Sequence, residues 1–343
     1  MNKIKKFYKS IPEGKVKGFM AKIYEKKSRL SHMPKLPSFV QIEPTTRCNL
    51  DCTMCMRKDF IRTGNMKMGD MSFDKFKIIA EKIPSMERID FQGVGEPFLN
   101  TDTVKMIKYS TDLGKETFAI TNGTMIGSMS EDIVKSNLDL LKISFYSPDK
   151  FGYAKIMKNS NLNLILKNID KINRVKRNIG STKPVLEICT GVLEENLKDL
   201  PKLPELLHKI GVSNLSIGEI YGTKNPITLK GIEKIIKEVK KKSAEHKIKT
   251  NVNISKDIYD YTKKCIWPWV ATYITWDGYV KPCCSRPYFL DFDFGNIFKE
   301  DFKEIWNSEK YVSFRKSLRS KNVPLMCRGC QYDFSAFDEK NGK

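Results

Sequence analysis

Histidine is scarce in this sequence, and its scarcity limits the metal and hydrolase sites that the chain can build. The 343 residues include three histidines, His32, His208 and His246, and none stands at a spacing typical of a metal site or a catalytic triad. The motif Gly-x-Ser-x-Gly, which presents the serine of many α/β-hydrolases, is also missing. The sequence therefore gives no support to a Ser-His-Asp hydrolase.

Long apolar segments are missing as well. No run of eighteen apolar residues occurs, so we expect no membrane span. The N-terminal residues MNKIKKFYKS lack the apolar core of a signal peptide, which favours a cytoplasmic protein. Nine cysteines in such a protein indicate metal ligation rather than disulfide bonds.

Positive charge is present in excess. The chain has 61 Lys and Arg against 40 Asp and Glu, a net charge of +21. A basic chain can bind nucleic acid, an anionic membrane surface or an anionic substrate. Its lysines are spread along the whole sequence, which favours a solvated surface, and aromatic residues are not interleaved with the basic runs. Nucleic acid is therefore a disfavoured partner, and an anionic substrate is mildly favoured.

Strands and helices alternate along most of the chain. A basic leader over 1–37 comes first, with apolar residues between 16 and 24 spaced as on one face of a helix. Strands are expected at 39–43, 88–92, 117–120, 141–145, 185–190 and 214–217, and helices at 73–83, 103–113, 131–136, 164–175, 197–210 and 232–244. Six such units predict an α/β fold, a partial (β/α)6 barrel over 38–258. A small cysteine-rich domain with a hairpin-like turn at 276–279 is expected over 259–343.

The cysteine loop, residues 48–55, follows the first expected strand. Cys48, Cys52 and Cys55 place three thiolates within eight residues. Three ligands leave one position open at a tetrahedral metal or a four-iron cluster, and an open position is where a substrate can bind. Half of a zinc site, or three reduced cysteines without metal, are the alternatives for this spacing.

Polar and glycine-rich segments follow the next strands, and ligands of parallel α/β folds bind at the carboxyl ends of strands. The second strand is followed by the glycine loop, residues 93–97, and the third and fourth strands by further polar residues. The residues expected on this rim are Gly93, Gly95, Glu96, Pro97, Asn122, Ser144 and Ser147. Glycine permits close backbone approach to a ligand, and Glu96 can accept hydrogen bonds from an ammonium group.

A second set of cysteines lies near the C-terminus. Cys265, Cys283, Cys327 and Cys330 are enough to ligate one metal centre fully, with Cys284 as a spare or alternative ligand. A zinc ribbon with four cysteine ligands is the alternative to an iron–sulfur cluster here. Cys189, within the fifth expected strand, is interpreted as a buried core residue.

The cysteine loop and the rim together resemble the radical S-adenosylmethionine (SAM) enzymes. In that family three cysteines hold a 4Fe–4S cluster whose free iron binds SAM. The loop 93–97 is similar to the Gly-Gly-Glu-Pro element that holds the SAM amino group, although Val94 stands where its first glycine would be. The resemblance implies SAM contacts from Gly93, Gly95, Glu96, Pro97, Asn122, Ser144 and Ser147, and from the backbone around Met54, where the family usually has an aromatic residue.

The C-terminal stretch resembles the SPASM/twitch subfamily of these enzymes. The similarity runs through 276–284, Gly295-Asn296-Ile297, Glu304-Ile305-Trp306 and Arg315 to the closing Cys327-x2-Cys330. Full SPASM domains hold two clusters with further cysteines, whereas Cys330 is the last cysteine here. The resemblance therefore implies the shorter twitch form, with one auxiliary 4Fe–4S cluster on Cys265, Cys283, Cys327 and Cys330.

The resemblance implies reductive cleavage of SAM to a 5′-deoxyadenosyl radical, which abstracts hydrogen from a substrate. A fully ligated auxiliary cluster favours net oxidation, because it can accept an electron from the substrate radical. The short flanks of the two cysteine sets, 47 and thirteen residues, favour a small molecule or cofactor precursor over a peptide. Within the family, the alternative function is peptide or protein modification by a maturase. Outside the family, the alternative is a zinc-stabilised nucleic-acid-binding protein. A low-potential donor such as flavodoxin or ferredoxin is the implied partner.

Overall fold

The structure is a computed structural model that describes residues 31–220, 227–254, 265, 267–283, 285, 287–288 and 292–327. The leader helix expected between 16 and 24 lies outside these residues, as do Cys284 and Cys330. The domain limits at 37 and 258 therefore stay predictions. No helix in the described ranges is long and apolar enough to cross a bilayer.

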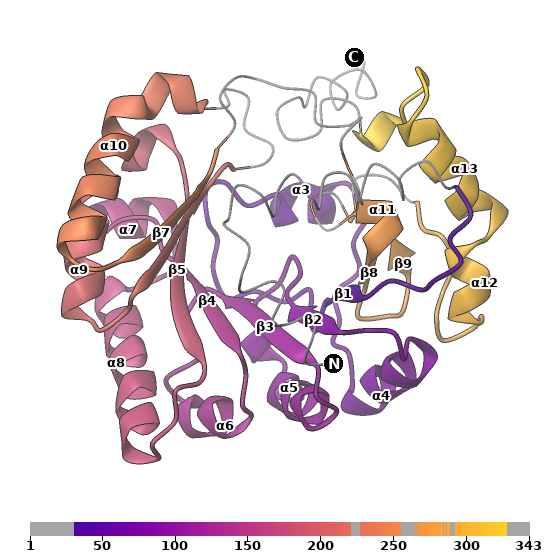
Figure 1. The fold of residues 1–343 in the computed structure, drawn as a ribbon, viewed down its shortest axis with the longest axis horizontal. Helices are drawn as coiled ribbons and strands as arrows, with labels where there is room; N and C mark the ends of the chain where they lie inside the picture. The colour runs from indigo at the N-terminus through magenta and orange to yellow at the C-terminus, as the bar shows by residue number, and fades with distance from the viewer. Residues whose placement is uncertain are drawn as a thin grey trace, which may run out of the picture.

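A curved sheet forms the centre of the molecule (Figure 1). Over the described residues it has nine strands in the order β7-β6-β5-β4-β3-β2-β1-β8-β9. The strands are β1 Phe39–Ile42, β2 Arg88–Phe91, β3 Glu116–Thr121, β4 Leu140–Ser144, β5 Val185–Gly191, β6 Asn214–Gly218, β7 Lys249–Asn253, β8 Ala271–Ile274 and β9 Val280–Lys281. All neighbours pair in parallel except β8 and β9, which are antiparallel. The predicted α/β fold with a parallel sheet is confirmed.

Most helices lie along the outer side of this sheet, whereas the short helix α3 lies within its arc (Figure 1). The α-helices are α3 Arg57–Arg62, α4 Phe73–Lys82, α5 Thr103–Asp112, α6 Ser130–Lys135, α7 Lys150–Ile156, α8 Leu162–Asn178, α9 Leu203–Lys209, α10 Leu229–Glu245, α11 Trp267–Val270, α12 Phe302–Trp306 and α13 Glu309–Leu318. Short 3₁₀ turns are η1 Pro97–Leu99, η2 Glu194–Asn196, η3 Leu200–Lys202 and η5 Leu325–Cys327. This arrangement leaves the carboxyl ends of the strands free of crossover helices.

The strands β4, β5 and β6 differ between their two faces, because successive side chains of a strand point to opposite sides. Leu141, Ile143, Leu186, Ile188, Leu215 and Ile217 are buried in the hydrophobic core. The alternate positions Lys142, Ser144, Glu187, Cys189, Asn214 and Ser216 are half-buried. The apolar positions belong to the side covered by helices, so the polar ones line the inner side of the arc.

All six predicted strands are present, but the predicted helix over 197–210 is wrong in its first half. The structure has the 3₁₀ turn η3 there, and α9 begins only at Leu203. Pro201 and Pro204 explain the difference, because proline lacks an N–H for the helical ladder and is accepted only in a first turn. Strand β7 was not predicted, since its sequence Lys-Thr-Asn-Val-Asn is largely polar and it lies at the edge of the sheet.

The C-terminal region continues the same sheet. Strand β8 pairs in parallel with β1, with Phe39 opposite Ala271 and Ile42 opposite Ile274. The expected hairpin is confirmed as β8–β9, and its turn requires Gly278, which has φ +90° and would place a Cβ 2.3 Å from the Phe298 ring. The strand that carries the cysteine loop is therefore fixed on both sides, by β2 and by the C-terminal region.

Candidate active site

The cysteine loop leaves β1 at the carboxyl edge of the sheet and is held by backbone hydrogen bonds from two sides. The Asp51 and Thr53 amides donate to the Lys158 and Ile156 carbonyls at 3.1 and 3.0 Å, at the end of α7. On the other side the Arg47 carbonyl accepts from the Glu96 amide at 2.8 Å. Because the protein itself satisfies these groups, the loop conformation does not depend on a bound metal alone.

The glycine loop packs backbone to backbone against the cysteine loop. A Cβ on Gly95 would lie 2.4 Å from the Thr45 carbonyl oxygen and 2.5 Å from that of Arg47, and a Cβ on Gly93 would lie 2.5 Å from Glu43 Cγ. Close contacts within the protein therefore explain why both positions are glycine. From the sequence alone, these glycines were expected to allow the close approach of a ligand. The two loops form one unit, and a ligand held by one is placed relative to the other.

The three thiols of the cysteine loop are half-buried and not in disulfide bonds. Burial raises the pKa of Cys52 to about 12, with smaller contributions from the neighbouring thiols of Cys55 and Cys48, and burial likewise raises the pKa of the other two. Thiolates in this setting need a cationic partner, which iron supplies. Among the described residues no three His, Cys, Asp or Glu side chains converge on a point suited to one metal ion. Three cysteines in one loop fit a cluster in which each cysteine binds its own iron.

Glu96 is buried, with 2% of its surface exposed, and its carboxylate accepts hydrogen bonds within the protein. Oε1 accepts from Thr121 Oγ1 at 2.7 Å and from the Phe98 amide at 3.1 Å, while Oε2 accepts from the Asn122 amide at 2.6 Å. Burial raises the pKa of Glu96 to about 7, an effect that these donors partly offset. The carboxylate thus ties the glycine loop to the end of β3, a role that the sequence did not reveal.

Replacing Glu96 by alanine is expected to destabilise the metal-free chain by about 3 kcal/mol, because three buried donors lose their acceptor. A carboxyl whose pKa rises on folding stabilises the fold fully below its unfolded value, here 4.5, and this contribution is lost as the pH passes about 7. The free energy of unfolding should therefore fall less steeply in the variant than in the wild type between about pH 5 and pH 8. Urea titrations at several pH values measure the free energy of unfolding of the wild type and of Glu96→Ala, with the exposed Glu131→Ala variant as the matched control. Equal stability and equal slopes would contradict this role.

The other predicted rim residues separate into two groups. Asn122 lies beside the cysteine loop, where its Nδ2 donates to Asn49 Oδ1 at 2.9 Å and lies 3.9 Å from Cys48 Sγ. Ser144 lies on the inner face, with its Oγ 3.9 Å from Cys189 Sγ. Ser147 is fully buried, and its hydroxyl donates to Asp199 Oδ2 at 2.5 Å. Asn122 therefore lies beside the cysteine loop and Ser144 on the inner face, whereas the Ser147 hydroxyl is buried against Asp199, and the predicted contacts of all three with SAM stay predictions.

Met54 and Pro97 complete the predicted set. Met54 is half-buried within the cysteine loop and packs against the hydrophobic core. Pro97 is buried as the first residue of η1, where a missing N–H costs nothing. Their predicted contacts with SAM stay predictions.

Two residues that sequence reasoning missed support the site. Asn168 in α8 is buried and donates from Nδ2 to the carbonyls of Gly123 and Thr124, at 2.9 and 3.0 Å, which shapes the loop that carries Asn122. Glu43 follows β1 directly and is fully buried. A glutamate at the carboxyl end of a buried strand was a signal available in the sequence, whereas an asparagine within a helix was not.

Three of the four C-terminal cysteines lie within the described residues. Cys265, Cys283 and Cys327 are half-buried and not in disulfide bonds, and the Cys265 carbonyl accepts from Arg319 Nη2 at 2.7 Å. Arg315 is fully buried, and its Nε donates to the Pro268 carbonyl at 2.8 Å, close to Cys265 in sequence. The predicted ligation by these cysteines and Cys330 stays a prediction.

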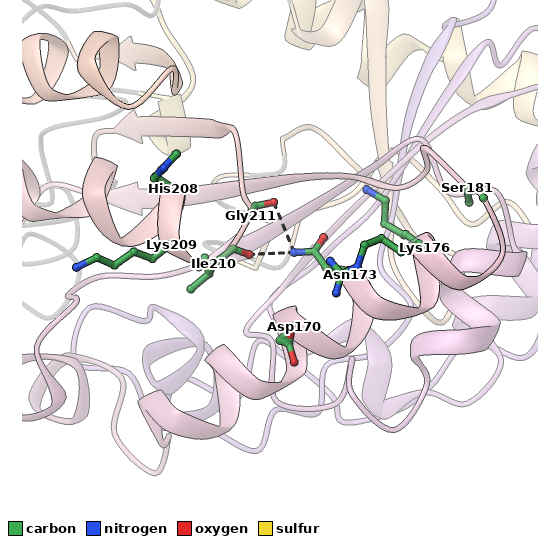
Figure 2. Close-up of a pocket in the computed structure, with 10 residues that line it drawn as sticks. Asp170, Asn173, Lys176, Ser181, His208, Lys209, Ile210 and Gly211 are labelled. Atoms are coloured by element: carbon green, nitrogen blue, oxygen red, sulfur yellow. Dashed lines mark hydrogen bonds between the residues drawn. The ribbon is translucent and has the colours of Figure 1, made fainter.

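A cavity of about 630 Å³ lies elsewhere, between the ends of α8 and α9. Figure 2 shows Asn173 of α8 pointing towards the Ile210 and Gly211 carbonyls, to which its Nδ2 donates at 3.0 and 3.5 Å. This cavity lies where α8 and α9 end and their following strands begin, at the edge opposite the cysteine loop. It is therefore not part of the candidate active site.

Comparison with protein families explains the two cysteine sets. The model of the radical SAM superfamily matches residues 42–207, and that of the SPASM iron–sulfur cluster-binding domain matches residues 265–331. The chain carries a radical SAM domain followed by a SPASM domain. Its first cysteine loop lies in the radical SAM domain, which binds a 4Fe–4S cluster and SAM, and its second cysteine set lies in the SPASM domain. The match favours clusters over zinc at both places.

Curated relatives agree with this family. A tungsten-containing aldehyde ferredoxin oxidoreductase cofactor-modifying protein of Pyrococcus furiosus is 26% identical over 323 residues, covering 85% of this chain and 86% of the relative. A probable GTP 3′,8-cyclase of Methanocaldococcus jannaschii is 27% identical over 269 residues, covering 72% of this chain and 85% of that protein.

Solved structures with bound S-adenosylmethionine share the fold. Streptococcus suis SuiB bound to S-adenosylmethionine superposes with a TM-score of 0.69 at 16% identity, covering 90% of this chain and 75% of SuiB. The structure of anSMEcpe with bound AdoMet gives a TM-score of 0.58 at 19% identity, covering 83% of this chain and 81% of that one. At these identities the similarity establishes the architecture of this radical SAM protein and leaves its substrate open.

Proposed function

We propose that this radical SAM enzyme oxidises a polar small molecule or cofactor precursor and uses an auxiliary cluster as electron acceptor. When bound, the first cluster and SAM supply a radical that abstracts hydrogen. The observation that carries the proposal is the face of β4, β5 and β6 on which half-buried polar residues alternate with the core residues of these strands.

This inner face presents two rows of polar side chains across neighbouring strands. Lys142 Nζ lies 3.0 Å from Glu187 Oε1, and this pair is mostly shielded, with 26% and 18% of the two side chains exposed. One step closer to the rim, Ser144, Cys189 and Ser216 are in register with one another. Hydroxyl, thiol and charged groups offer hydrogen bonds to a polar substrate and little surface to an apolar one.

Net oxidation removes one hydrogen atom, one electron and one proton from the substrate. The hydrogen atom goes to the SAM-derived radical, the electron to the auxiliary centre and the proton to a basic group or solvent. A low-potential donor in the cytoplasm, such as flavodoxin or ferredoxin, would supply the electron for SAM cleavage. The P. furiosus relative, named a cofactor-modifying protein, matches 85% of this chain and supports a cofactor precursor as substrate.

The substrate class can be tested without knowing the substrate. Anaerobically reconstituted enzyme is incubated with SAM, dithionite and either the low-molecular-weight or the peptide and protein fraction of a cell extract. We expect the low-molecular-weight fraction to accelerate formation of 5′-deoxyadenosine, because substrate binding places a reactive hydrogen next to the radical. Acceleration by the peptide fraction alone would instead support a peptide maturase.

A further inference from the structure

Glu43 joins the C-terminal region to the glycine loop. Its carboxylate is fully buried and accepts from Tyr273 Oη at 2.7 Å, from the Val94 amide at 3.2 Å and from the Tyr288 hydroxyl. Two of these donors come from the region after the barrel, and the third is in the loop that resembles the SAM-binding element. A buried carboxylate with three donors fixes the position of each.

The Tyr288 ring contacts the cysteine-loop side of the site as well. Its centroid lies 5.8 Å from that of Phe60 in α3, the helix that begins two residues after Cys55. Phe60, Met66 and Tyr288 form a small buried cluster, and Met56 and Val94 pack against it. Tyr288 therefore contacts α3, which follows the cysteine loop, and binds Glu43 at the end of β1, in a cluster that Val94 of the glycine loop also joins.

This cluster gives a physical reason for Val94. The SAM-binding element of the family has glycine at this position, which leaves the backbone without a side-chain anchor. In this chain the valine side chain packs against the cluster that contains Tyr288, and its amide donates to Glu43. The glycine loop is thus attached to the C-terminal region through one side chain and one carboxylate.

We infer that Tyr288 and Glu43 are positioning residues that make SAM affinity depend on the state of the auxiliary cluster. Tyr288 follows Cys283, a predicted ligand of that cluster, by five residues. Ligation of Cys283 fixes this segment, Tyr288 then holds Glu43 and Val94, and the glycine loop keeps the conformation that binds SAM. The inference rests on the proposed function and on the predicted role of residues 93–97.

The coupling is measured with a double-mutant cycle on SAM binding. Tyr288→Phe removes the hydroxyl and keeps the ring, and Cys283→Ala removes the predicted auxiliary ligand. Dissociation constants of SAM are determined by anaerobic equilibrium dialysis for the wild type, both single variants and the double variant, all with the core cluster reconstituted. We expect each single change to weaken SAM binding about tenfold and the double variant to be no weaker than either.

Two controls separate this result from damage to the fold. Tyr279→Phe changes a tyrosine next to the turn of the β8–β9 hairpin, outside the Glu43 network, and should leave SAM affinity unchanged. Core iron content should stay the same in Tyr288→Phe, and the midpoint of thermal unfolding should fall by only a few degrees, as expected when a buried carboxylate loses one of three donors. Additive effects in the double variant, or unchanged affinity in Tyr288→Phe, would overturn the inference. Failure of the wild type to bind SAM at all would instead overturn the proposed function.

Discussion

Simultaneous replacement of Cys48, Cys52 and Cys55 by alanine is expected to abolish SAM cleavage and to leave about four irons per chain. The three thiols lie in one loop that the backbone of α7 and the glycine loop hold in place. Removing them therefore deletes the SAM-binding cluster, while the C-terminal cysteines, which belong to the SPASM domain, still bind iron. Formation of 5′-deoxyadenosine and the iron content of the purified variant are the measurements.

The matched control for this triple variant is Cys189→Ala. Cys189 lies on β5 outside both cysteine sets, so this variant should retain all of its iron. Persistent SAM cleavage by the triple variant would contradict the assignment of these cysteines. Complete loss of iron would contradict the second cluster.

The second large effect is expected from Cys265→Ala. This variant should lose about four irons and all product formation while it still cleaves SAM at saturating concentration. The physical reason is that the radical is generated at the cysteine loop, whereas the substrate radical requires a separate electron acceptor for net oxidation. The measurement is the ratio of oxidised product to 5′-deoxyadenosine, with the low-molecular-weight fraction as substrate source.

Product formation by the Cys265→Ala variant would contradict the role of the auxiliary cluster. The reaction would then be redox-neutral, and the C-terminal region would have a structural role through β8 and β9. Loss of SAM cleavage at all SAM concentrations would indicate that the C-terminal region is needed for the fold of the core, to which β8 is directly paired.

The sequence predicted the parts of this protein that local patterns encode. Short apolar runs that alternate with segments of helical periodicity predicted strands β1 to β6. Cys48, Cys52 and Cys55 lie in the loop that follows the first of these strands. Polar β7 was missed, because edge strands need no continuous apolar run. The helix over 197–210 was placed too early, because the hydrophobic spacing was given more weight than Pro201 and Pro204.

The contacts that organise the site could not be predicted in the same way. Glu43 and Tyr288 are separated by 245 positions and Glu96 and Thr121 by 25, and no local pattern indicates that they meet. A polar side chain on the rim can form hydrogen bonds with a ligand or with other protein groups, and the amino-acid sequence does not distinguish these two roles. The oxygens of Ser147 and Glu96 are engaged with Asp199 and with the end of β3, and the predicted contacts of both residues with SAM stay predictions.

The most direct test of two clusters in one radical SAM enzyme is the amount of iron, sulfide and zinc per chain after anaerobic reconstitution. We predict about eight irons, about eight sulfides and no zinc, since each 4Fe–4S cluster contributes four of each. About four irons with one zinc would contradict the auxiliary electron acceptor, and zinc without iron would contradict the radical reaction itself.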